Sequence, residues 1–131
     1  MSGDLDGDGR TPEEEKMALT RAFRETVKAR AERDARFREA LFTEALNAWL
    51  AGEAAAGRAL LRDLVNATVG FEALARATGR PAKSLHRMLS PSGNPTSESL
   101  FQIVHAVARA TGMRPTVTVA SRPSRRPRRA A

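Results

Sequence analysis

The sequence predicts a mainly α-helical protein, with a helix-turn-helix bundle of about five helices, an extra N-terminal helix and one short C-terminal strand. Between Pro12 and Gly52 no proline or glycine interrupts a run rich in Ala, Arg, Glu and Leu, which are strong helix formers. Further along, apolar residues recur at helical spacing, and a glycine follows most of these segments. The 131 residues suffice for one domain with an apolar core and flanking segments.

The first helix has a strong predicted start. Thr11 is a suitable N-cap, Pro12 fits the first helical position, and Glu14 completes a capping box. We expect a break near residues 33–36, because a thin apolar stripe on a highly charged helix changes there to a broad one. Residues 12–36 are therefore predicted to form a charged amphipathic arm, and residues 1–11 an acidic flexible leader.

The leader also matches a calcium-binding pattern. Asp4, Asp6, Asp8, Gly9 and Glu15 occupy the positions that an EF-hand loop requires. An EF-hand loop lies between two helices, however, and too few residues precede the first aspartate to form the entering helix. We interpret the match as an acidic leader that ends in a helix cap, and we predict no metal site and no cofactor.

The remaining elements follow from apolar spacing and from glycine or proline breaks. Predicted helices cover residues 37–51, 54–69, 71–78 and 81–89, and a last helix is capped by Thr96 and Ser97 and ends at Gly112. The segment Met113–Ala120 alternates Thr and Val after a proline, which predicts a single strand. Because one strand alone is unstable, we expect it to pair with its copy in a second subunit, which would make a symmetric homodimer.

The charge is strongly asymmetric along the chain. The net charge of +7 arises from 22 Lys and Arg against 15 Asp and Glu, and the excess of positive charge lies in the C-terminal half. Residues 121–131 form an Arg- and Pro-rich tail that we expect to be disordered. Such a chain favours a polyanionic partner, nucleic acid being the commonest, although acidic proteins and anionic membrane surfaces attract the same charge.

Several functional classes are disfavoured by the composition. The chain has no cysteine, so it has neither disulfides nor thiolate metal sites. No apolar run is long enough for a transmembrane helix and no signal peptide is recognisable, so we expect a soluble cytoplasmic protein with no membrane partner. Ser84 and His86 lie on different faces of one helix, and no arrangement of nucleophile, base and oxyanion donors is recognisable. We predict no enzymatic activity.

The most informative stretch is FEALARATGRPAKSLHRMLS, residues 71–90, which fits a twenty-residue helix-turn-helix. Leu74, Leu85 and Met88 stand where apolar contacts fix the second helix on the first. Ala75 is small where the two helices cross, and Gly79 accepts a left-handed turn. The plainer interpretation is a pair of short helices within a helical bundle, because such hairpins are common.

The second helix of this pair carries hydrogen-bonding groups and no acid on its predicted outer face. These groups are Lys83, Ser84, His86 and Arg87. Lys and Arg can donate to guanine in the major groove, and Ser and His can bond base edges or phosphates. Arg80 cannot be buried without a partner, so we expect it to point outward and contact a phosphate.

The segment LHRMLSPSGNPT, residues 85–96, resembles the small helix-turn-helix regulators known as addiction-module antidote proteins, or antitoxins. The loop SPSGNP is the most specific part of this resemblance, which covers about residues 54–120. It implies a phage-repressor-like fold, here residues 37–120, and binding of double-stranded operator DNA as a dimer, often with autoregulation beside a toxin gene. In a transcriptional regulator of this kind Ser92, Asn94 and Thr96 are expected to hold phosphates. The long N-terminal helix, the Arg-rich tail and His86, where the family usually has tyrosine, depart from the pattern.

A second hypothesis is a protein-interaction module within a toxin-antitoxin system. Its essential act would be to bind a toxin through the apolar stripe of residues 12–36. An amphipathic helix that docks in a groove would use Phe23 and Val27 as anchors.

Overall fold

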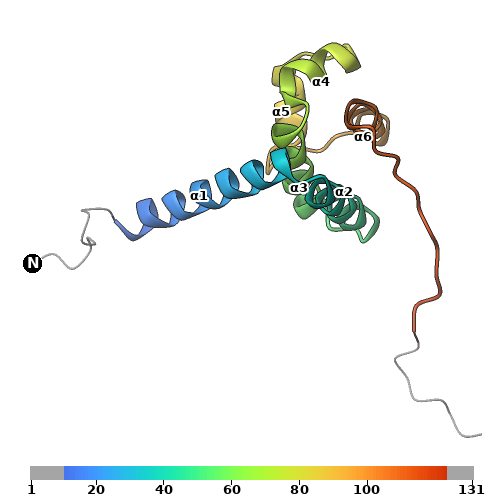
Figure 1. Ribbon diagram of the computed structural model, residues 1–131. Helices are drawn as coiled ribbons and strands as arrows, with labels where there is room; N and C mark the ends of the chain where they lie inside the picture. Colours follow the sequence, from blue (N-terminus) through green and yellow to red (C-terminus); the bar gives the residue numbers. More distant parts are fainter. Residues whose placement is uncertain (1–10, 124–131) are drawn as a thin grey trace, which may run out of the picture.

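The computed structural model describes residues 11–123, and this part of the chain is mainly helical, as predicted (Figure 1). Its helices are α1 (Pro12–Arg33), α2 (Ala35–Leu50), α3 (Ala54–Ala67), α4 (Gly70–Thr78), α5 (Ala82–Met88) and α6 (Ser97–Thr111). Two segments lie outside the described residues: the leader up to Arg10 and the tail from Ser124 onward. The leader holds every residue of the calcium-binding pattern except Glu15.

The start of α1 and the break after it agree with the prediction. The N–H of Glu14 donates to Thr11 Oγ1 at 3.1 Å, and the N–H of Thr11 donates to the Glu14 carboxylate at 3.0 Å. The break lies at Asp34, whose backbone is extended and whose carboxylate accepts from the N–H groups of Arg36 and Phe37. One aspartate therefore ends the first helix and caps the second.

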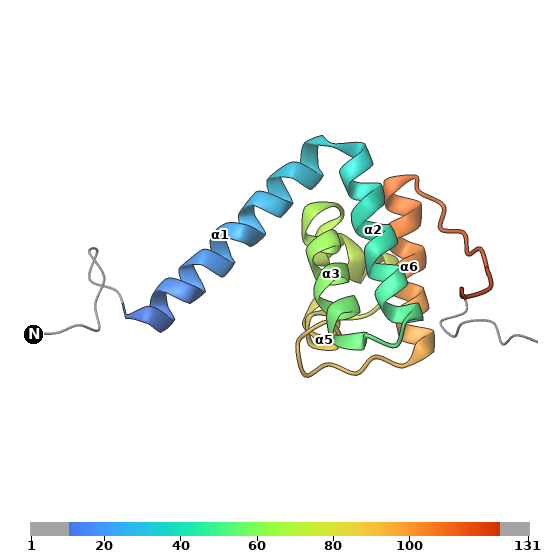
Figure 2. The same cartoon turned by 90° about the horizontal axis from the view of Figure 1, so that it is seen from below.

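The helix α1 is only partly covered. Ala31 is fully buried and Val27 packs against the core, but Met17, Leu19 and Phe23 are each more than 60% exposed. Figure 2 shows the N-terminal half of α1 projecting away from the other helices. The apolar stripe of this helix is thus divided into a part that packs on the protein and a part that faces solvent.

The core is built around α3, which contacts α1, α2 and α4. Leu61, Leu64 and Val65 of α3 have no exposed surface. The other buried apolar side chains around them come from α2, α4, α5, the C-cap of α5 and α6: Leu41, Phe42, Ala45, Phe71, Leu74, Leu85, Leu89, Ile103, Val104, Val107 and Ala108. The predicted inward faces of these helices are therefore the observed ones.

Two local predictions need correction. The broad apolar stripe predicted after the break at residues 33–36 includes Leu50, but this last residue of α2 is 67% exposed and does not join the core. Pro81 was expected as the first helical residue but precedes α5 as its N-cap, with a ψ of 142° that is extended rather than helical.

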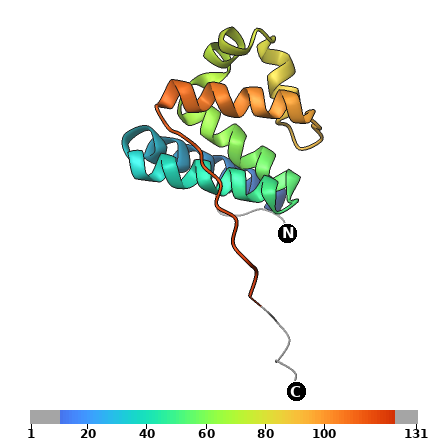
Figure 3. The ribbon, with the colours of Figure 1, turned by 90° about the vertical axis from the view of Figure 1, so that its right-hand side faces the viewer.

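The predicted C-terminal strand is not observed in the described residues. Residues 113–123, here called the C-terminal arm, have no assigned secondary structure and extend from the end of α6 past α2 (Figure 3). A strand is defined by hydrogen bonding to a neighbour. No other segment of residues 11–123 runs beside the arm in an extended conformation, so no ladder forms within one chain.

Candidate nucleic-acid interface

The turn between α4 and α5 fixes the position of the candidate recognition helix. Gly79 has φ 71° and ψ 18°, the left-handed conformation predicted for this position, and its N–H donates to the Ala75 carbonyl at 2.9 Å. Leu74 on α4 is 1% exposed, and Leu85 on α5 has no exposed surface. These buried contacts hold α5 on the core, so the side of α5 opposite Leu85 faces outward.

The outward side of α5 carries the side chains that the sequence analysis selected. Lys83, His86 and Arg87 are exposed, and Ser84 is half-buried. The helix contains no acidic residue. This arrangement presents N–H and O–H donors to solvent with no carboxylate on the same helix to neutralise the two cationic side chains.

His86 is held in place by an aromatic contact that the sequence analysis did not foresee. Its ring stacks on Phe71 of α4, with 3.8 Å between ring centroids and 21° between the ring planes. Phe71 is 6% exposed and belongs to the core. One face of the imidazole is therefore covered by protein, and the ring can hydrogen-bond an outside group only through its edge.

Arg80 differs from its expected environment. It was predicted to point outward and contact a phosphate, and its side chain is also part of a contact between the turn and α6. Its Nε donates to Gln102 Oε1 at 2.9 Å, and its backbone N–H lies 3.4 Å from Thr78 Oγ1. The remaining guanidinium N–H groups have no acceptor within residues 11–123, so the group keeps donors for an external anion while Gln102 fixes its direction.

The loop after α5, residues 89–96, is anchored by two arginines of α3. Arg58 donates from Nε to the Ser90 carbonyl at 3.0 Å and from Nη2 to the Pro91 carbonyl at 2.8 Å. Arg62 Nη1 lies 3.3 Å from the Leu89 carbonyl. In the sequence these arginines contribute only to the predicted charge, although their spacing of four residues on one helix already places both on one face.

A glycine makes the close folding of this loop possible. The Gly93 N–H donates to the Ser90 carbonyl at 2.9 Å. A Cβ at Gly93 would lie 2.2 Å from the Met88 carbonyl oxygen and 2.4 Å from that of Arg87. The loop therefore lies directly against the C-terminal end of α5, and its position is coupled to that of the helix.

The three loop residues that were expected to hold phosphates have different roles in the structure. Ser92 and Asn94 are exposed beyond the end of α5. Thr96 is the N-cap of α6: its Oγ1 accepts from the Ser99 N–H at 3.1 Å and donates to Ser99 Oγ at 2.9 Å. The structure thus brings Ser92 and Asn94 near the end of the candidate helix, and it gives the Thr96 hydroxyl a structural role.

Within residues 11–123, no three His, Asp or Glu side chains gather as a metal site would need. No helix in this part of the chain has the length and apolar character needed to cross a membrane.

No protein-family model matches the chain, and no curated protein or solved structure is significantly similar to it.

Proposed function

We propose that this chain is a sequence-specific transcriptional regulator of the phage-repressor-like helix-turn-helix type that binds double-stranded DNA as a homodimer. The observation that carries the proposal is the exposed, acid-free face of α5, with Lys83, His86 and Arg87 outward and Leu85 anchored in the core. A rigid helix with such a face matches what a major groove requires, because side chains must reach base edges from a fixed backbone.

In this proposal the side chains divide between base and phosphate contacts. Lys83, Ser84, His86 and Arg87 approach bases. Phosphate contacts come from Ser92 and Asn94, and from the guanidinium donors of Arg80 that Gln102 leaves unused. Thr96 contributes to the interface by ending the loop and capping α6 rather than through a free hydroxyl. The resemblance to the addiction-module antidote proteins supports an autoregulatory role for such binding.

The experiment is selection of binding sites from random DNA, followed by titration of the selected duplex. Arg87→Ala is expected to cost about 1–3 kcal/mol of binding free energy and to relax the preference at one base pair. The matched control is Arg36→Ala, which removes the same charge from an exposed residue of α2. Equal displacement of the protein by random competitor DNA and by the selected site would rule out sequence-specific binding.

A second candidate function, an antitoxin that acts by binding a toxin, is favoured by the exposed part of α1. Leu19 and Phe23 are 68% and 67% exposed, and they continue the stripe that Val27 and Ala31 begin on the core. Because Ala31 is buried, removal of the whole helix would damage the fold. The substitution Phe23→Glu tests the same surface without that cost.

The two functions are separable with this variant. If a toxin reading frame neighbours the gene, its product can be co-expressed with the wild type and with Phe23→Glu. Loss of co-purification with unchanged DNA affinity assigns toxin binding to α1. Retained co-purification excludes this surface as the toxin-binding site. The control Ala29→Glu introduces the same charge at an exposed position of α1 on the side opposite the apolar stripe.

A further inference from the structure

The C-terminal arm leaves its backbone polar groups without partners. The N–H of Met113 donates to the Ala108 carbonyl at 3.0 Å. Beyond it, no backbone N–H or C=O of the arm is hydrogen-bonded within residues 11–123. The sequence of the arm nevertheless alternates Thr and Val from Thr116 to Val119, as strands do, and an isolated strand is not stable in water.

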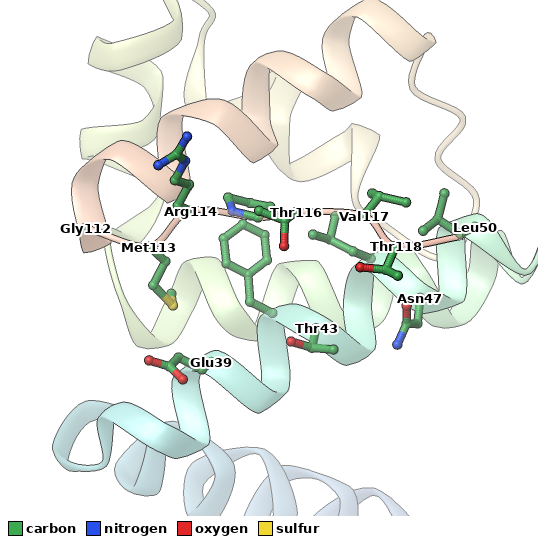
Figure 4. A pocket seen from close by; sticks show the side chains of 13 residues that line it. Glu39, Thr43, Asn47, Leu50, Gly112, Met113, Arg114, Thr116, Val117 and Thr118 are labelled. Carbon is green, nitrogen blue, oxygen red and sulfur yellow. The ribbon is translucent and has the colours of Figure 1, made fainter. Parts of the chain in front are cut away.

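A groove of about 490 Å³ separates the arm from α2. Figure 4 shows arm residues from Met113 to Thr118 lying across from the exposed side of α2. The groove is lined by Phe42, Leu46 and Leu50 on the helix side and by Val117 on the arm side. Leu50 and Val117 are 67% and 68% exposed, and Val119, just beyond, is 91% exposed. Phe42 is buried in the core, so the largely uncovered apolar side chains at this groove are Leu50, Val117 and Val119.

We propose that the arm and this groove bind a second copy of the chain. The arms of two protomers pair as an antiparallel two-stranded ribbon about a two-fold axis, and their valines cover the apolar side of α2. A second copy is the occupant because identical segments satisfy each other: each arm supplies the N–H and C=O groups that the other lacks. This inference concerns the subunit contact and does not depend on DNA binding.

Pro115 restricts how the arms can pair. It has no N–H, so in an antiparallel ribbon it must occupy a non-hydrogen-bonded pair. Pairing classes alternate along a strand, so Val117 and Val119 share the class of Pro115, whereas Thr116 and Thr118 belong to the hydrogen-bonded class. The two threonines therefore supply the ladder hydrogen bonds, and the proline and valines lie together on the other face.

The symmetry axis then passes through Thr116 or Val117. With Val117 on the axis, Pro115 lies opposite the partner's Val119 and Arg114 opposite the partner's Ala120. With Thr116 on the axis, Pro115 lies opposite the partner's Val117 and Arg114 opposite the partner's Thr118. Both registers place apolar residues across from each other. Neither register places an arginine of one arm directly opposite an arginine of the other arm, which would be unfavourable.

The test is a single-cysteine scan in the full chain, which has no native cysteine. Cα atoms directly opposite on the axis lie about 4.5–5.5 Å apart, within the range that a disulfide spans. Mild oxidation without DNA should give a covalent dimer most efficiently for Thr116→Cys or Val117→Cys. It should give little for the controls Arg114→Cys and Ala120→Cys, whose copies lie farther apart. Uniform or absent cross-linking across the scan overturns the ribbon.

Proline substitutions in the arm are a second test of the hydrogen bonds between the two arms. They should leave the fold intact, because beyond Met113 the arm makes no contact with the buried core. Thr118→Pro removes an N–H that bonds the partner, twice per dimer by symmetry. It should raise the dimer dissociation constant about tenfold or more in sedimentation equilibrium. The matched control Val119→Pro, in a non-hydrogen-bonded pair, should change it much less.

Two outcomes of the sedimentation experiment would overturn the proposal. One is a wild-type chain that stays monomeric at concentrations on the order of 100 μM, where even weak dimers form. The other is an equal effect of the two proline variants, which would show a dimer that does not use this ladder. A monomeric chain would also remove the homodimer from the proposed function. Neither outcome bears on whether α5 binds DNA, which the Arg87→Ala titration tests separately.

Discussion

The substitution Gly93→Ala tests how the loop after α5 is held. In an open loop this change would stabilise the protein by about 0.4–1 kcal/mol, because alanine lowers the conformational entropy of the unfolded chain. Here the added methyl group would lie 2.2 Å from the carbonyl oxygen of Met88 and 2.4 Å from that of Arg87. The structure therefore predicts that the sign of the effect is reversed.

The size of the effect follows from what must move. Both carbonyls belong to the backbone at the end of α5, so they cannot rotate away as a flexible side chain could. The Arg87 carbonyl also accepts from the N–H of Ser90 at 3.2 Å and from its hydroxyl at 2.7 Å. Relief of the clash must shift the loop or unwind the last turn of α5. We expect destabilisation by about 1–3 kcal/mol, the usual cost of overpacking.

Urea unfolding provides the assay, because the chain has one tryptophan, Trp49, and its helical content gives a second signal by circular dichroism. The control is Ser92→Ala, an exposed neighbour in the same loop, for which a change within about 0.5 kcal/mol is expected. If Gly93→Ala is neutral or stabilising, the loop does not lie against α5 as described. The coupling between loop and candidate recognition helix would then be wrong.

Other predictions concern the core, the loop anchor and one half-buried acid. Leu85→Ala should destabilise by about 2–5 kcal/mol in urea unfolding, because the side chain has no exposed surface and its loss leaves a cavity; a smaller loss would show that α5 is loosely attached. Arg58→Met keeps much of the aliphatic packing but removes the donors to two loop carbonyls, and should cost about 1–3 kcal/mol; the exposed Arg76→Met is its control, and equal effects would discount the anchor. Burial raises the pKa of the Asp63 carboxyl, against the lowering effect of Arg62 and Arg24. The folded protein thus binds this proton more tightly than the unfolded chain. The free energy of unfolding therefore falls as the pH rises through the raised pKa and the carboxyl becomes charged. Asp63→Asn should stabilise at pH 7, with the gain disappearing below about pH 4, and a gain independent of pH would contradict this cause.

The tertiary structure decided how the candidate site is supported. The sequence placed Lys83, Ser84 and Arg87 on the outer face of α5, because the buried Leu85 fixes the direction of a short helix. It did not reveal the stacking of His86 on Phe71, because aromatic residues 15 positions apart carry no local signal of contact. The anchoring of the loop by α3 joins residues 32 and 33 positions apart, and it was missed for the same reason.

The sequence by itself determined the local features of this protein: where helices begin and end, and which face of each helix is apolar. The capping box at Thr11, the break at Asp34 and the left-handed turn at Gly79 depend on the conformational preferences of a few adjacent residues. Only the tertiary structure decided that Leu50 and the valines of the arm stay exposed and that Arg80 is tied to α6. Those outcomes depend on which distant segments meet, and neither helix propensity nor hydrophobic spacing encodes that choice.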